Sequence, residues 1–440
     1  MFEEEQKLKK WKEEIESKTM PEERLEHAIN KGFEQAKIKM QKRRTYKQGI
    51  WSIVVAAILI LSFVTSIRVS PAFANAIASI PGMERIVEMI QDNKGLQLAI
   101  ENDHYQPIDV TDETENVKVT LKGIITDETS LVAFHTVTFK EKNHPDFIVN
   151  YRILDTDGND LSKKVSYSNN WGHETETESM NTLEIELNAP IPREPLVLEV
   201  QIGDDIDTHE VKKSISLPFQ VQLQPVKKEQ YEINEKVTVD GQSIMIKNIT
   251  VGPLKTAVEV ECAPENTKEI FGFEDLRIVD AKGEVWTSIK NGIYARYTED
   301  PNRKIYFLQS NYFKESDELY LKFNKLMALD KEEATLVINT ETEEIVEQPK
   351  DQRFSDLKMR GLFMDIKLKG EKDYYHDPFS TFYDAEGKEL QSKWGSFYQS
   401  DDEINNFGLE LPNVEFTNPL HFPLHAYPSY IKGNVKIKIK

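Results

Sequence analysis

The sequence predicts a mostly β protein: tandem immunoglobulin-like β-sandwiches outside a membrane, one transmembrane helix, and a short helical cytoplasmic head. Three observations support this fold class. The run from Gly49 to Ile67 holds nineteen residues without a charged side chain. Beyond about residue 114, apolar and polar residues alternate, which is the period of a β-strand. An Asp-x-x-Gly turn also occurs three times, at spacings of 125 and 104 residues, which suits domains of about 100 residues.

Residues 1–48 are predicted to form the helical head. Thr19 is a suitable N-cap, and Glu22 stands three residues later to complete a capping box. Five apolar residues then follow at helical spacing and share one face: Leu25, Ile29, Phe33, Ala36 and Met40. Because a lone helix of this length is marginal in water, this stripe needs a cover. We predict that it binds a partner protein; the bilayer surface and the segment from Trp11 to Ile15 are the alternatives.

The apolar run at 49–67 is predicted to cross a membrane once as a helix. At ~1.5 Å per residue it would be roughly 28 Å long, close to the ~30 Å of a hydrocarbon core. The fifteen residues before it hold six Lys or Arg, whereas the fifteen after it hold only Arg68. Since positive charge stays on the cytoplasmic side, the head is expected inside and the C-terminal part outside. A buried helix of a soluble protein is one alternative, and a signal peptide cut at Ala72-Phe73-Ala74 is the other.

The charge of the two sides differs. The head carries 13 basic and 10 acidic residues, whereas the part after the apolar run carries 42 basic and 65 acidic residues. Because phosphate contacts need Lys and Arg, this acidic part is not expected to bind nucleic acid directly. Cys262 is the only cysteine, so the chain cannot form an internal disulfide. It follows the alternating run Ala257–Glu261, which predicts a strand and favours a buried structural thiol over a reactive one.

The part after the span is predicted to consist of a helical neck, residues 68–113, and three β-sandwich domains. In the neck, apolar spacing indicates a short helix within Phe73–Ile80 and a second over Met83–Asp92. The three domains are expected at residues 114–228, 229–348 and 349–440.

Two β-hairpins open the first and second of these domains. The first pairs 117–122 with 131–139 across a turn at 127–130, and the hairpin recurs with strands at 244–249 and 256–262. This repetition supports a tandem arrangement of similar domains.

The recurring turns are Asp155–Gly158, Asp280–Gly283 and Asp384–Gly387. Each follows an apolar strand, and its glycine is expected to adopt a positive φ angle without steric cost. The first copy is surrounded by further acidic residues and could ligate calcium, but its order does not match an EF-hand loop. A plain turn is therefore the favoured interpretation.

No pattern of catalytic residues emerges from the sequence. His421 and His425 are four residues apart, but prolines surround them, and the acidic residue of an HExxH motif is missing. The sequence contains no GxSxG motif, phosphate-binding loop or paired-cysteine metal pattern. We therefore predict that the protein is not an enzyme and has no catalytic residues, metal site or cofactor.

The stretch PAFANAIASIPGMERIVEMIQDNKGLQLAIENDHYQPID, followed by VKVTLKGIITDETSLVAF, resembles a family of Gram-positive single-span membrane proteins of uncharacterised function. PEERLEHAINKGFEQAKIKMQKRR and the apolar run fit the same family, so the resemblance covers about residues 20–220. The later part resembles the immunoglobulin-like domain often attached to it. Members are frequently described as anti-sigma-factor-like, which implies that the head holds a sigma factor while the outer domains sense the envelope. The head lacks the His-x-x-x-Cys-x-x-Cys pattern of zinc-type anti-sigma domains, so binding would fall to the stripe or its basic flank.

These observations lead to one principal hypothesis and an alternative. The principal one is a single-pass protein of the cell membrane that acts as an anti-sigma-factor-like envelope sensor or regulator. Its extracellular β-domains would bind an unknown ligand, and its cytoplasmic helix would bind the partner. The alternative is a passive adhesion or structural module of the envelope, for which the head is only a topological anchor.

Overall fold

The computed structural model describes residues 2–16 and, with short gaps, residues 83–440. The described residues are 2–16, 83–141, 145–168, 177–205, 210–222, 227–287, 294–371, 374, 376–392, 394–401 and 403–440. The chain divides into two compact units, Met1–Pro71 and Ala72–Lys440. In the first unit, helix α1 (Phe2–Glu16) exposes Leu8 and Trp11, with 68% and 71% of their surfaces accessible.

Several predicted elements lie outside the described residues. They are the span at 49–67, the short neck helix within 73–80, and the stripe of Leu25, Ile29, Phe33, Ala36 and Met40. Among the helices that the structure describes, none combines the length and the apolar character needed to cross a membrane.

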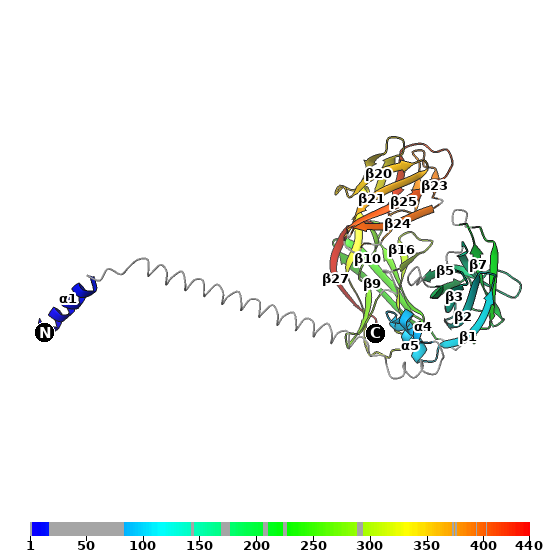
Figure 1. The fold of residues 1–440 in the computed structure, drawn as a ribbon, viewed down its shortest axis with the longest axis horizontal. Helices are drawn as coiled ribbons and strands as arrows, with labels where there is room; N and C mark the ends of the chain where they lie inside the picture. The colour runs from blue at the N-terminus through cyan, green and yellow to red at the C-terminus, as the bar shows by residue number, and fades with distance from the viewer. Residues whose placement is uncertain are drawn as a thin grey trace. The chain divides into compact units, whose positions relative to one another are not determined.

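The second unit is mostly β and consists of antiparallel sheets, which confirms that part of the predicted fold class (Figure 1). Its strands fall into three groups, which we call the first (β1–β8), second (β9–β17 with β27) and third (β18–β26) β regions. The predicted domain boundaries and the immunoglobulin type of the sheets stay predictions.

The first β region has two sheets around one core. The larger sheet has the order β1 (Tyr105–Glu113), β2 (Val117–Thr126), β3 (Ser130–Phe139), β6 (Glu178–Leu187) and β5 (Ser162–Ser168). The smaller has the order β4 (Phe147–Leu154), β7 (Leu196–Gly203) and β8 (Lys213–Phe219). Alternate residues of both sheets point inward, so Val119 and Leu121 share a core with Leu198 and Val200. The pairing of β2 with β3 confirms the first predicted hairpin.

The second β region is built in the same way. One sheet has the order β15 (Tyr294–Tyr297), β16 (Arg303–Gln309), β11 (Lys255–Cys262), β10 (Gln242–Val251) and β9 (Glu229–Val239). The other has the order β12 (Lys268–Phe273), β17 (Leu319–Asp330), β13 (Arg277–Asp280) and β14 (Val285–Trp286), with β27 (Tyr430–Lys438) also paired to β17. Trp286 is fully buried in their common core. The pairing of β10 with β11 confirms the second predicted hairpin.

The third β region also has two sheets. One sheet has the order β19 (Glu344–Glu347), β18 (Thr335–Asn339), β26 (Leu420–Pro423), β22 (Thr381–Tyr383) and β23 (Glu389–Gln391). The other has the order β20 (Phe354–Arg360), β21 (Phe363–Lys369), β25 (Ile404–Glu410) and β24 (Trp394–Asp401). The 3₁₀ turn η1 (Lys331–Glu333) leads into β18. Phe271, Met327 and Leu329 of the second β region contribute to the core of the third. Together with β27, which returns to pair with β17, they bind the two regions to each other.

The three Asp-x-x-Gly turns have the same construction. In each, one carboxylate oxygen of the aspartate accepts hydrogen bonds from backbone N–H groups two and four residues later, at 2.8–3.0 Å. The glycines have φ angles of 84°, 83° and 79°. These values confirm the predicted left-handed glycine, and the carboxylate of Asp155 stabilises its own turn.

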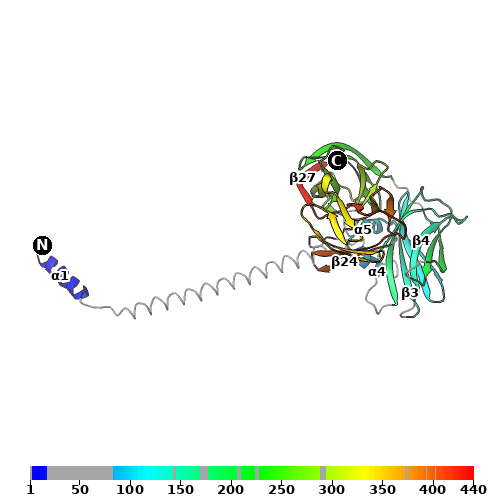
Figure 2. The same cartoon turned by 90° about the horizontal axis from the view of Figure 1, so that it is seen from above.

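Two short helices precede the first strand. Residues 105–113 of the predicted neck form strand β1, so we keep the name neck for residues 83–104. Helix α4 (Met83–Ile90) agrees with the predicted second neck helix and buries Ile86 and Ile90. Helix α5 (Lys94–Glu101) was not predicted. In both views of the molecule the two helices lie beside the strands of the first and second β regions (Figures 1 and 2).

Candidate functional site

The described residues that the sequence singled out do not form a single site. His421 lies in β26, and the Nε2 atom of His425 is hydrogen-bonded to the hydroxyl of Ser380 in the same β region. Cys262 ends β11, and burial raises the pKa of its thiol to about 11, so the thiol stays protonated at neutral pH. Among the described residues, no group of three or more His, Cys, Asp and Glu side chains could hold a metal ion.

In the sequence, the neck lies between the predicted span and the first β region. Its apolar residues pack in a cluster with side chains from both neighbours. Phe134 and Met180 come from the first β region, and Leu254 comes from the second. Each fully buried aliphatic side chain contributes about 1.5–3 kcal/mol to such packing. The neck is therefore held by two β regions at once.

Helix α5 begins at a defined N-cap. The Oδ1 atom of Asn93 accepts a hydrogen bond from the backbone N–H of Leu96 at 3.1 Å, and Asn93 is itself buried. This bond satisfies one of the free N–H groups of the first helical turn. The cap fixes where α5 starts and therefore which of its residues face the second β region.

Gly95 allows α5 to approach the second β region very closely. A Cβ atom at this position would stand 2.7 Å from the backbone nitrogen of Ser310 and 3.1 Å from its carbonyl oxygen. Backbone atoms cannot turn aside as the tip of a side chain can, so only glycine fits here without a shift. Ser310 is only 1% exposed.

Hydrogen bonds fix the register of this contact. The Nε2 atom of Gln309 donates to the carbonyl oxygen of Asp92 at 2.8 Å, and its Oε1 atom accepts from the backbone N–H of Lys94 at 3.3 Å. The Nζ atom of Lys94 donates to the carbonyl oxygen of Val285 at 3.0 Å. We call residues 309–313, which hold the neck, the neck seat. Its last member, Phe313, lies edge-on to the ring of His104, with 4.4 Å between the ring centroids.

The first and second β regions also contact each other directly at Glu186. This carboxylate, on β6, is paired with Lys163 at 3.3 Å within its own region. Across the boundary it pairs with Lys255 of β11 at 3.7 Å and with Arg296 of β15. Burial alone would raise the pKa of Glu186, but the surrounding positive charges outweigh it and lower the pKa. Glu186 is therefore ionised at neutral pH and connects the two regions.

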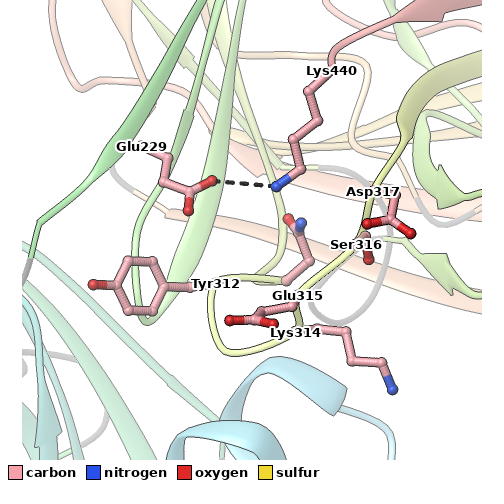
Figure 3. Close-up of a pocket in the computed structure, with 8 residues that line it drawn as sticks. Glu229, Tyr312, Lys314, Glu315, Ser316, Asp317 and Lys440 are labelled. Atoms are coloured by element: carbon pink, nitrogen blue, oxygen red, sulfur yellow. Dashed lines mark ion pairs between the residues drawn. The ribbon is translucent and has the colours of Figure 1, made fainter.

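A pocket of about 280 Å³ lies beside the neck seat (Figure 3). Two seat residues, Asn311 and Tyr312, contribute to its wall. Its charged residues are Glu229, Glu315, Asp317, Lys314 and Lys440. Both lysines are already paired: Lys440 with Glu229 at 3.8 Å, and Lys314 with Glu284 at 3.2 Å.

A second polar cluster surrounds Lys304 on β16. Its Nζ atom donates to the carbonyl oxygens of Ile270 and Phe271 at 3.0 and 3.2 Å and lies 5.1 Å from the centroid of the Tyr297 ring. Burial lowers the pKa of Lys304. The lysine stabilises the strand ends around it, and the cavity beside it is only about 20 Å³. A cavity of this size holds little more than one water molecule.

Comparisons with known proteins match two parts of the chain. Residues 43–139 match the model of a domain of unknown function, DUF4179, and residues 228–359 match that of a family of unknown function, DUF5643. These matches agree with the resemblance to a family of uncharacterised function. The anti-sigma-factor-like role stays a prediction.

Comparisons with whole proteins add little to the two family matches. No curated protein matches the chain. Among solved structures, the crystal structure of the conserved domain protein from Bacillus anthracis is 12% identical, with 77% of this chain and 92% of that chain covered. Its TM-score is 0.38, so the likeness carries no argument about the fold.

The residues of the neck seat were missed from the sequence. Gln309 ends strand β16 and Ser310 follows it, and they contact residues more than 200 positions earlier in the chain. Two local features of the sequence could have indicated helix α5 and its close packing. Asn93 precedes an apolar stretch at the spacing of an N-cap, and Gly95 stands within a helical turn where alanine would be more stable.

Proposed function

We propose that this chain is a single-pass protein of the cell membrane that acts as an anti-sigma-factor-like regulator of an envelope response. In this proposal residues 49–67 cross the bilayer, the head lies in the cytoplasm, and the β regions are extracellular. The stripe from Leu25 to Met40 binds a sigma factor, and the β regions sense an unknown envelope ligand. The three equivalent Asp-x-x-Gly turns support the further proposal that the β regions are immunoglobulin-like repeats.

The observation that carries this proposal is the neck seat. The neck lies close after the proposed span, and both the first and the second β region hold it. A change in the arrangement of these regions therefore moves the neck or breaks its contacts. A passive anchor has no need of such a connection, because an extended linker would hold the β regions at the membrane equally well.

Topology is the first test. We expect protease added to intact cells to digest the three β regions and to leave an N-terminal tag on the head protected. Permeabilised cells supply the control, in which the tag is digested as well. Protected β regions in intact cells would refute the proposal.

Partner binding is the second test. The full chain, tagged at its N-terminus, is captured from detergent extract and probed for a sigma factor. We expect Phe33→Glu to lose the sigma factor and Gln35→Glu, on the opposite face of the predicted helix, to retain it. If neither the parent chain nor the control recovers a sigma factor, the regulatory role is wrong.

The third test links the two sides of the membrane. Gly95→Val adds a branched Cβ atom 2.7 Å from the backbone nitrogen of Ser310 and should release the neck from its seat. We expect the amount of captured sigma factor to change in this variant. An unchanged amount, together with full activity of a chain whose head is replaced by an unrelated basic sequence, would favour the passive envelope module.

A further inference from the structure

The pocket beside the neck seat has two carboxylates that are available to a ligand. Glu315 and Asp317 are exposed, and in the part of the chain that the structure describes neither forms an ion pair. The two lysines of the pocket are engaged with Glu229 and Glu284. The charge that remains uncompensated in the pocket is therefore negative.

The arrangement of these carboxylates suits an extended ligand. Figure 3 shows the side chains of Glu315 and Asp317 on different sides of Ser316, so they do not converge on one point. A metal ion needs several ligand atoms within about 2.6 Å of one centre. An organic molecule that carries ammonium groups can instead reach both carboxylates along its length, with charge-assisted hydrogen bonds at each.

Neutral polar groups complete the pocket wall. The hydroxyl of Ser316 is buried and has no hydrogen-bond partner among the described residues. Asn311 is 4% exposed and also lines the pocket.

We propose that this pocket binds a small organic compound with at least one ammonium group and further polar groups. A volume of about 280 Å³ is just below the ~300–1,000 Å³ range of small-molecule sites. The compound is therefore small, of the size of a diamine, an amino acid derivative or one amino sugar.

The pocket shares its wall with the neck seat, so a bound ligand would act on the neck. Tyr312 lines the pocket and lies edge-on to Phe313, with 4.9 Å between ring centroids. Phe313 in turn contacts His104 at the end of the neck. This consequence rests on the proposed function, whereas ligand binding itself does not.

The experiment measures binding to the full chain in nanodiscs of uncharged phosphatidylcholine, by isothermal titration calorimetry. The probe is butane-1,4-diamine, and butane-1,4-diol serves as the neutral compound of the same length. We expect saturable binding of the diamine and none of the diol. The double variant Glu315→Gln with Asp317→Asn should bind the diamine at least about tenfold more weakly, because two charge-assisted contacts are lost.

The matched control is Glu332→Gln with Glu341→Gln, which removes two exposed charges outside the pocket and should retain the parental affinity. Equal weakening in the two double variants would show only a general attraction of cations to an acidic protein and would overturn the proposal. So would the absence of saturable diamine binding, or complete competition by an equal concentration of magnesium chloride. The topology test above uses no ligand, so failure of this site and failure of the proposed function are distinguishable.

Discussion

Acid should destabilise the first β region through a single histidine. His135, on β3, is fully buried, and its Nε2 atom is hydrogen-bonded to the hydroxyl of Tyr151 on β4 at 2.8 Å. Its Nδ1 atom is buried and has no partner among the described residues. A protonated ring would need an acceptor there as well, and burial lowers the pKa of His135 from 6.5 to about 4.

The magnitude follows from the difference between the folded and unfolded pKa values. At pH 7 the ring is neutral in the folded chain and mostly neutral in the unfolded chain, so its titration changes the free energy of unfolding little there. Between pH 6.5 and about pH 4 the unfolded chain takes up a proton that the folded chain cannot, and the free energy of unfolding falls as the pH falls. At about 1.4 kcal/mol for each pKa unit, the total loss is about 3 kcal/mol.

The variant His135→Gln tests this reasoning, because glutamine can still bond to Tyr151 but does not titrate. Hydrogen exchange of peptides from β3 and β4, corrected for intrinsic exchange rates, measures the free energy of opening at pH 7 and pH 4 in the full chain. The decrease between the two pH values should be about 3 kcal/mol smaller in the variant. Thr136→Gln, at the next position of β3, should keep the parental decrease. Equal decreases in parent and His135→Gln would refute the role of His135.

Three further outcomes follow from the structure. Gly95→Ala should destabilise the neck by about 1–3 kcal/mol, measured by hydrogen exchange of residues 94–101, because the new methyl group meets the backbone of Ser310. Gly272→Ala, whose Cβ would meet nothing within 4 Å, is the control and should change little. Glu186→Gln should cost about 1–3 kcal/mol in thermal unfolding and reduce its salt dependence, since the contacts to Lys255 and Arg296 lose their charge assistance. Finally, Cys262 should react with a maleimide at pH 7.5 roughly 100-fold more slowly in the folded chain than in guanidinium, as expected for a pKa that rises from 9.0 to about 11; comparable rates would contradict its burial.

The sequence predicted those features that depend on local pattern. Alternation gave the hairpins β2–β3 and β10–β11, because one face of each strand is buried. The three turns could be predicted because the residue after Asp-x-x has a positive φ angle, which glycine adopts without steric cost. The structure describes neither the predicted span nor the predicted partner stripe, so both stay predictions.

What could not be predicted depends on contacts between distant residues. In α5, Leu96, Leu98 and Ile100 alternate as in a strand, and only the cap from Asn93 and the packing of the neck select a helix. Strand β27 pairs with β17, more than 100 residues earlier, although its residues lie within the predicted third domain, 349–440. Pairing of this kind depends on register and edge availability, which a local pattern does not contain.

The composition of the neck seat determines how it can respond to force or to a ligand. Apolar packing alone would let α5 slide, because hydrophobic contacts have no preferred direction. The two hydrogen bonds of Gln309 and the close approach of Gly95 to Ser310 allow one register only. Leaving either group of the Gln309 amide buried without a partner would cost about 1–3 kcal/mol. A small shift of the second β region should therefore carry the neck with it, and a larger one should release the neck in a single step.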